Sequence, residues 1–201
     1  MTSRFDNAAK EWDRNERRRQ TAEKIFEAIN SRITLKPHMD IMDFGAGTGL
    51  LSFKIAPFVN SVTAVDLSEK MLEQLKSKNS AHLHIDTVVQ DIMQNPLEKR
   101  FDGIVSSMAM HHIEETEIFF NTLYAHLKRG GFIAIADLYK EDGSFHTAGN
   151  DGVHHFGFDT ETLEQLLEKA GFKNITFHHI HSIEKPHRNF DLFLLSAYKP
   201  G

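Results

Sequence analysis

The sequence contains no cysteine among its 201 residues. This absence excludes disulfides, thiolate metal sites and a cysteine nucleophile. Long apolar runs are missing as well, because no segment approaches the ~20 apolar residues that cross a bilayer. The first residues show no basic stretch followed by an apolar run. We therefore expect a cytoplasmic protein without a membrane span.

An excess of positive charge is also absent, since the formal net charge is −5. The chain thus has no general attraction for phosphate backbones. Its densest basic segment, Arg14–Arg19, lies among acidic residues and is typical of a solvated helix face. We expect no nucleic-acid partner. The 40% hydrophobic and 25% charged residues are ordinary for a folded protein, and the length fits one domain.

Short β-type runs alternate with helical runs along most of the chain. The β-type runs cover residues 39–44, 61–66, 84–90, 101–106 and 131–137, and two more follow at 174–182 and 191–198. The helical runs are 22–29, 69–78, 116–127 and the segment between a capping Asp159 and Gly171. Such alternation predicts an α/β fold with a doubly wound, mostly parallel sheet and helices on both faces.

One long stretch, residues 138–158, shows neither pattern and contains four glycines. Loops of about 20 residues are uncommon in compact domains unless they are functional or disordered. This loop follows the carboxyl end of a predicted strand, which is the edge where open α/β sheets bind ligands. We predict that it is a substrate loop.

The most informative segment runs from a predicted strand through Asp43, Gly45, Gly47 and Gly49 into a helix. Glycines at such a turn let the backbone bend sharply and approach a nucleotide-like ligand. Asp66 ends the next β-type run, 17 residues after Gly49. At that place a carboxylate can accept hydrogen bonds from both hydroxyls of a ribose.

Two other nucleotide sites do not fit this turn. A nicotinamide-binding fingerprint, Gly-x-Gly-x-x-Gly/Ala, requires glycine or alanine at its third position. That position falls on Leu50 or Ser52, depending on the first glycine chosen. The Gly-Lys-Ser/Thr of a phosphate loop is absent as well. Moreover, the negative charge of Asp43 would repel a pyrophosphate but favour a ligand with an ammonium or sulfonium charge. The turn therefore suits a zwitterionic ligand.

The pattern Asp43-x-Gly45-x-Gly47-x-Gly49 resembles the first motif of class I S-adenosylmethionine-dependent methyltransferases. Later stretches resemble further motifs of that family in the same order, namely Val65-Asp66-Leu67-Ser68, Gln90-Asp91-Ile92, residues 101–107 and residues 127–132. The resemblance runs from about Asp40 to the C-terminus. It implies S-adenosylmethionine as cofactor and a Rossmann-like, seven-stranded sheet whose last strand is antiparallel.

The resemblance also implies roles for particular residues. The backbone around Asp43 should receive the amino acid end of the cofactor, Asp66 its ribose and Asp91 its adenine amino group. Ser106 and Ser107 should lie near the methionyl chain. The full set of implied cofactor-binding residues is Asp43, Gly45, Ala46, Gly47, Gly49, Asp66, Leu67, Asp91, Ile92, Ser106 and Ser107.

Two further stretches, Phe5-Asp6-x-x-Ala9 with Trp12-Asp13 and Ala109–Ile113, are similar to the broad group that includes ubiquinone and menaquinone biosynthesis methyltransferases. That likeness implies a small-molecule acceptor and an N-terminal helix folded over the cofactor. We expect one methyltransferase domain spanning 1–201. Its parts would be an N-terminal helical cap (1–36), a cofactor-binding core (37–137), the substrate loop (138–158) and a C-terminal helix with a β-hairpin (159–201).

Histidines are the predicted proton-accepting groups of this site. Some methyl acceptors must lose a proton near neutral pH, a task suited to an imidazole. His111, just past the fourth strand, is the predicted catalytic residue, with a packing role as the alternative. The predicted substrate contacts are Trp12, His112, Tyr139, His146, His154 and His155.

A metal site is an alternative role for these histidines, with His111-His112 and His154-His155 as ligands beside Asp137 or Glu141. Because adjacent histidines usually project differently from a chain, no metal is predicted. The predicted function is S-adenosylmethionine-dependent methyl transfer to a small molecule. The alternative is a cofactor-binding regulatory or partner subunit without turnover, and the sequence names neither the acceptor nor the oligomeric state.

Overall fold

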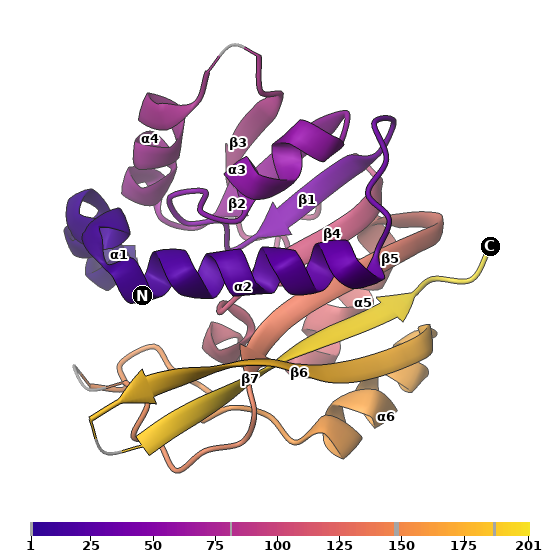
Figure 1. Cartoon of the computed structure of the whole chain (residues 1–201). Helices are drawn as coiled ribbons and strands as arrows, with labels where there is room; N and C mark the ends of the chain where they lie inside the picture. The colour runs from indigo at the N-terminus through magenta and orange to yellow at the C-terminus, as the bar shows by residue number, and fades with distance from the viewer. Residues whose placement is uncertain (1, 81, 147–148, 187) are drawn as a thin grey trace.

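A computed structural model describes residues 2–80, 82–146, 149–186 and 188–201 of the chain (Figure 1). Its elements in chain order are α1 (Thr2–Ala8), the 3-10 helix η1 (Ala9–Arg14), α2 (Glu16–Arg32), β1 (Asp40–Phe44), α3 (Ser52–Ile55), η2 (Ala56–Phe58), β2 (Ser61–Asp66), α4 (Glu69–Lys78), β3 (Ile85–Val89), β4 (Phe101–Ser107), η3 (Met110–His112), α5 (Thr116–His126), β5 (Leu127–Leu138), α6 (Thr160–Ala170), β6 (Lys173–Lys185) and β7 (Arg188–Tyr198).

The strands form one seven-stranded sheet in the order β3-β2-β1-β4-β5-β7-β6. Strands β1 to β5 pair in parallel, whereas β7 runs antiparallel to both of its neighbours. The predicted mostly parallel, doubly wound sheet with an antiparallel last strand is thus confirmed. The chain winds outward from β1 to β3 and then returns to the other side of β1 at β4. The carboxyl ends of β1 and β4 therefore flank the switch point where such sheets bind ligands.

Alternation along the strands divides the core between the two faces of the sheet. Ile41 belongs to a cluster with apolar side chains of α2, α3 and α4, whereas the next residue, Met42, packs with those of α5 and α6. Figure 1 shows α2 crossing one face of the sheet. Buried large side chains such as Phe101 and Phe119 contribute about 1.5–3 kcal/mol each to folding. The two clusters hold the sheet rigid beneath its carboxyl edge.

Local signals set the ends of several helices where they were predicted. The Ser68 side chain accepts a hydrogen bond from the Met71 amide at the start of α4, and Asp159 accepts one from the Thr162 amide at the start of α6. Gly171 ends α6 in the left-handed conformation, with φ of 99°.

The edges of other elements differ from the sequence expectation. Helix α2 begins at Glu16 rather than Ala22, because Asn15 caps it by accepting from the Arg18 amide. Strand β5 begins at Leu127, which pairs with Phe101 before a bulge interrupts the register. Strand β6 extends to Lys185 because β7 pairs with it along the whole hairpin.

The predicted substrate loop follows β5 and has one isolated bridge, between Tyr139 and Phe158, within its described part. Its return limb is fastened to η3, since the amides of His154 and His155 donate to the His111 carbonyl at 3.0 and 3.2 Å. The loop therefore lies against the carboxyl edge of β4. Within the described ranges, no helix combines the length and the apolar character needed to cross a membrane.

Gly103 of β4 provides a test of the packing between β4 and β5. A Cβ atom at Gly103 would lie 2.2 Å from Cζ of Phe132. We expect Gly103→Ala to lower the free energy of unfolding by about 1–3 kcal/mol, measured by urea denaturation. The double variant with Phe132→Leu should lose less than the sum of the two single variants, because the smaller side chain makes room. Additive losses would contradict this explanation.

Candidate functional site

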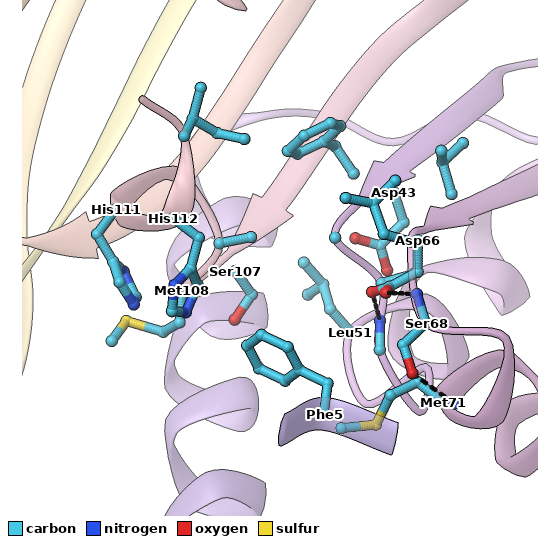
Figure 2. A pocket seen from close by; sticks show the side chains of 18 of the residues that line it. Phe5, Asp43, Leu51, Asp66, Ser68, Met71, Ser107, Met108, His111 and His112 are labelled. Carbon is cyan, nitrogen blue, oxygen red and sulfur yellow. Dashed lines mark hydrogen bonds between the residues drawn. The ribbon is translucent and has the colours of Figure 1, made fainter. Parts of the chain in front are cut away.

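A cavity of about 950 Å³ lies at the switch point of the sheet. It is lined by the carboxyl ends of β1, β2 and β4, by η3, by the predicted substrate loop and by the N-terminal helices. Its volume is at the upper end of the roughly 300–1,000 Å³ typical of pockets for small molecules and cofactors. Figure 2 shows polar side chains at two ends, Asp43, Asp66 and Ser68 at one and His111 and His112 at the other.

The glycine turn after β1 presents its backbone to this cavity. Gly45, Gly47 and Gly49 all have positive φ, at 66°, 55° and 84°. A Cβ at Gly45 would lie 2.4 Å from Cβ of Ala109, and one at Gly49 would lie 2.7 Å from Leu75, so both positions also require glycine for packing. A Cβ at Gly47 would meet no atom of the described residues within 4 Å. The backbone at Gly47 is therefore open to a ligand.

Asp66, at the end of β2, ties the turn to the neighbouring strand. Its Oδ2 accepts from the Gly47 amide and its Oδ1 from the Ser68 amide, both at 2.8 Å. Burial raises the pKa of this carboxyl, while the hydrogen bonds from Ser68 and Gly47 oppose that rise. Each carboxylate oxygen keeps acceptor capacity on the cavity side, which suits the paired hydroxyls of a ribose.

Asp43 is the most deeply buried acid of the cavity, with 1% of its surface exposed. Ser52 Oγ donates to its Oδ2 at 2.5 Å. Burial raises the pKa of Asp43 to about 7, and the nearby charge of Asp66 adds to the rise. Two acids of one cavity, both with raised pKa, favour a ligand that brings a positive charge.

The ends of β3 and β4 supply the next predicted contacts. Asp91 lines the cavity and its Oδ1 accepts from the Met93 amide at 3.0 Å, while the adjacent Ile92 is fully buried and lines it too. Ser107 also lines the cavity. Ser106 does not, because its hydroxyl donates to the Phe44 carbonyl at 2.9 Å and ties β4 to β1.

The N-terminal helices cover the cavity. The Phe5 ring contacts Trp12 and His112, with centroid distances of 5.7 and 5.2 Å, and the Arg18 guanidinium lies 3.6 Å from the centre of the Trp12 ring. Polar links fasten this cover to the glycine turn and to the start of α4. Ser68 Oγ donates to Asp6 at 2.6 Å, and Thr48 Oγ1 donates to Asp13 at 2.5 Å.

His111 is held at the opposite end by a buried carboxylate. Its Nδ1 lies 2.8 Å from Asp137 Oδ1, and its backbone amide donates to Asp137 Oδ2 at 3.1 Å. Both side chains are almost fully buried, at 2% and 0% exposure. Because the carboxylate accepts the proton of Nδ1, the other nitrogen, Nε2, is left unprotonated in the neutral ring. His111 itself lines the cavity.

Two more histidines meet His111. His112 Nδ1 donates to the Gly152 carbonyl at 2.7 Å, and His146 from the predicted substrate loop lies beside both rings. The ring centroids of His111 and His112 are 4.1 Å apart, and that of His146 lies 5.1 and 6.0 Å from them. Burial, followed by the charge of His111, lowers the pKa of His112 and of His146 to about 4.

The expectation that these adjacent histidines project apart is wrong at this turn. Asp137 and the Gly152 carbonyl each take one ring nitrogen, and both rings then lie in contact on the same side of η3. Figure 2 shows His111 and His112 next to one another at one end of the cavity, with Met108 beside them.

Most predicted site residues line the cavity, and four do not. Gly49 packs against Leu75 and Phe53, and Ser106 bonds within the sheet. Tyr139 packs on Phe193, and His155 contacts the Glu114 carbonyl and the ring of Phe158. The predicted residues that do line it are Asp43, Gly45, Ala46, Gly47, Asp66, Leu67, Asp91, Ile92, Ser107, His111, Trp12, His112, His146 and His154.

Other lining residues were missed from the sequence. Lys185 and Ile183 reach the cavity from the end of β6, which the sequence pattern ended too early. Phe145 of the loop also lines the cavity, and the Lys185 ammonium lies 4.0 Å from its ring centre. Met71 projects from α4, and only the helical spacing of that segment could have indicated it.

The raised pKa of Asp43 gives a test of its buried position. The folded protein keeps this proton up to pH about 7, whereas the unfolded chain loses it near its ordinary 3.8, so stability falls as pH rises through that window. We expect Asp43→Asn to stabilise the ligand-free protein, and the gain in unfolding free energy should be larger at pH 8 than at pH 5 by about 1–3 kcal/mol. Urea denaturation at both pH values measures it, and a gain that does not change with pH would refute it.

Comparisons with known proteins agree with this geometry. Residues 41–131 match the family model of a methyltransferase domain. An uncharacterised methyltransferase of Schizosaccharomyces pombe is 31% identical over 156 residues, which are 69% of this chain and 55% of that protein. A malonyl-[acyl-carrier protein] O-methyltransferase of Ilyobacter polytropus is 30% identical over 171 residues, 84% of this chain and 59% of that protein. The chain thus spans a little over half the length of these relatives.

Solved structures give the same fold. Phosphoethanolamine N-methyltransferase 2 of Haemonchus contortus, in complex with S-adenosyl-L-methionine, superposes with a TM-score of 0.71 over 88% of this chain and 52% of that one, at 20% identity. At this identity the likeness is evidence for the fold. Together, the domain match, the relatives and the shared fold support a class I S-adenosylmethionine-dependent methyltransferase.

Proposed function

We propose that the protein binds S-adenosylmethionine in this cavity and transfers its methyl group to a small-molecule acceptor. The observation that carries the proposal is that one cavity joins the glycine turn, with Asp43 and Asp66, to an opposite end built from histidines. The first end fits a zwitterionic nucleoside, and the second leaves room for a second reactant. We assign the covering helices to residues 1–36 and the acceptor loop to 138–158 of a single domain.

The residues present fit the cofactor. The open backbone at Gly47 beside buried Asp43 suits the charged amino acid end, because a cation there offsets the cost of a buried carboxylate. Asp66 would take the ribose hydroxyls, and Asp91 with Ile92 would hold the adenine. The rings of Phe5 and Trp12 close the cavity above them.

S-adenosylmethionine supplies an electrophilic methyl group on a sulfonium, so the protein has mainly to align the acceptor and exclude water. The N-terminal cover and the loop do both, since each closes one side of the cavity. His111, oriented by Asp137, is the residue placed to help an acceptor lose its proton. Its Nε2 can do so by taking that proton directly or by holding an ion that acidifies the acceptor.

The relatives do not name one acceptor. By their names, one methylates an oxygen of a malonyl group on a carrier protein and another the nitrogen of phosphoethanolamine. A subunit without turnover, the alternative function, would need only the cofactor end of the cavity. The buried His111–Asp137 pair at the other end favours an enzyme, because burying two polar side chains together carries a desolvation cost that cofactor binding alone does not require.

Cofactor binding is tested by calorimetric titration with S-adenosylmethionine and, separately, with S-adenosylhomocysteine. Trp12 is the single tryptophan of the chain and lines the cavity, so its fluorescence should change on binding. We expect micromolar binding of both ligands. Binding of neither would refute the proposed function.

Asp66→Asn tests the ribose contact. We expect it to weaken binding of both ligands by about 1.5–3 kcal/mol, because two charge-assisted hydrogen bonds would be lost or weakened. Asp86→Asn, on an exposed position of β3, is the matched control and should bind normally. Equal affinities for the two variants would remove Asp66 from the cofactor site.

Turnover is tested by release of S-adenosylhomocysteine in the presence of pools of small-molecule acceptors. Once an acceptor is found, His111→Ala should lower kcat by about 10²–10⁴-fold while the cofactor affinity stays within about twofold of wild type. Unchanged kcat would leave His111 with a packing role.

A further inference from the structure

We propose that His111, His112 and His146 form a binding site for one divalent transition-metal ion at the acceptor end of the cavity. The site itself stands on the geometry of the three side chains. Only the role given to the ion below rests on the proposed methyl transfer.

The three imidazoles converge on one point. One ring nitrogen from each lies within 4.8 Å of the corresponding nitrogens of the other two. Nitrogens bound to one tetrahedral ion at 2.0–2.1 Å lie about 3.4 Å apart. Closing that gap requires side-chain rotations that shift the nitrogens by about 1 Å or less each, and no change of fold. His146 belongs to the loop, so its backbone can follow.

The outer contacts are those expected around metal-binding histidines. His111 Nδ1 bonds the Asp137 carboxylate and His112 Nδ1 bonds the Gly152 carbonyl, at 2.8 and 2.7 Å. Such contacts select the tautomer whose Nε2 is an unprotonated donor, and they orient the ring. The buried Asp137 also supplies a negative charge behind the site.

His146 adds an independent observation. Its Nδ1 is buried and finds no hydrogen-bond partner among the residues that the structure describes. An unsatisfied buried nitrogen destabilises the folded state. An ion bound at Nδ1 of His146 would remove that cost.

Neither alternative for the cluster accounts for all three rings. A general base needs a single imidazole, and aromatic packing does not require two Nδ1 atoms to be tied to acceptors. Two cations help to lower the pKa of His146: Arg4, whose guanidinium donates to the carbonyls of Gly149 and Asp151, and Lys185, which donates to the Phe145 carbonyl. Both cations are engaged with carbonyl groups, and the Asp137 carboxylate offsets part of their charge.

The donor set limits the ion. Three neutral imidazoles suit Zn²⁺, Fe²⁺, Co²⁺ or Ni²⁺ and not Mg²⁺ or Ca²⁺, which prefer oxygen ligands. Three protein ligands also leave an open position, as in catalytic metal sites. Because all three histidines line the cavity, that position faces the acceptor. The acceptor class is then a small molecule with an oxygen or sulfur donor that binds the ion and releases its proton to solvent.

The test uses the full chain without a polyhistidine tag, stripped with EDTA and dialysed. Titration with Co²⁺, followed by visible absorption, and with Zn²⁺, followed by calorimetry, should give one strong site per chain. His112→Ala and His146→Ala should each weaken that binding at least about tenfold. His38→Ala is the control, because this exposed histidine precedes β1 at the opposite edge of the sheet.

Metal binding that is absent, or equal in wild type and in both site variants, would overturn the proposal. His146→Ala changes a loop residue, so its fold should persist, and the thermal unfolding of each variant checks this. Trp12 fluorescence with S-adenosylhomocysteine is measured on the same stripped samples. If the wild type binds no metal but binds S-adenosylhomocysteine normally, this inference alone is refuted. Metal binding by a wild type that does not bind S-adenosylhomocysteine would refute the proposed function and leave the metal site.

Discussion

The carboxylate of Asp66 is the contact on which the rest of the site depends. It joins the amide of Gly47, in the turn after β1, to the amide of Ser68, at the start of α4. Ser68 in turn caps α4 and reaches Asp6 of the N-terminal helix. A single side chain thus sets the turn, the next helix and, through Ser68, the cover. Because the Asp66–Gly47 contact joins the ends of two strands, the arrangement requires the parallel pairing of β1 with β2, which the two-sided core supplies.

The sequence was sufficient where the signal is local. Strand and helix alternation predicted the sheet, and Ser68, Asp159 and Gly171 marked helix ends that the structure confirms. The glycine turn and Asp66 were also readable, because positive φ and a strand-end acid leave a trace in residue type and spacing. Each of these features is decided by residues that are close in the sequence, or by the repeated succession of strand, turn and helix.

What escaped the sequence depends on contacts between distant segments. The convergence of His146 with His111 requires the loop to fold back over η3, and no spacing encodes that return. The place of Lys185 at the cavity follows from how far the β6–β7 hairpin extends, which is decided by pairing across the sheet. Likewise, Ser106 and Ser107 look alike in sequence, yet strand alternation sends one hydroxyl into the sheet and leaves the other at the cavity.

The way the N-terminal cover is fastened bears on the order of events in a catalytic cycle. Its inner surface meets the cavity through the rings of Phe5 and Trp12, whereas its links to the body run through Asp6 and Asp13 to Ser68, Thr48 and Lys78. Partly exposed polar links of this kind contribute about 1 kcal/mol or less each, so they can break without unfolding the sheet. In the proposed function, S-adenosylhomocysteine would leave when this cover opens, whereas the acceptor would enter beneath the loop, so the two molecules would exchange by separate routes.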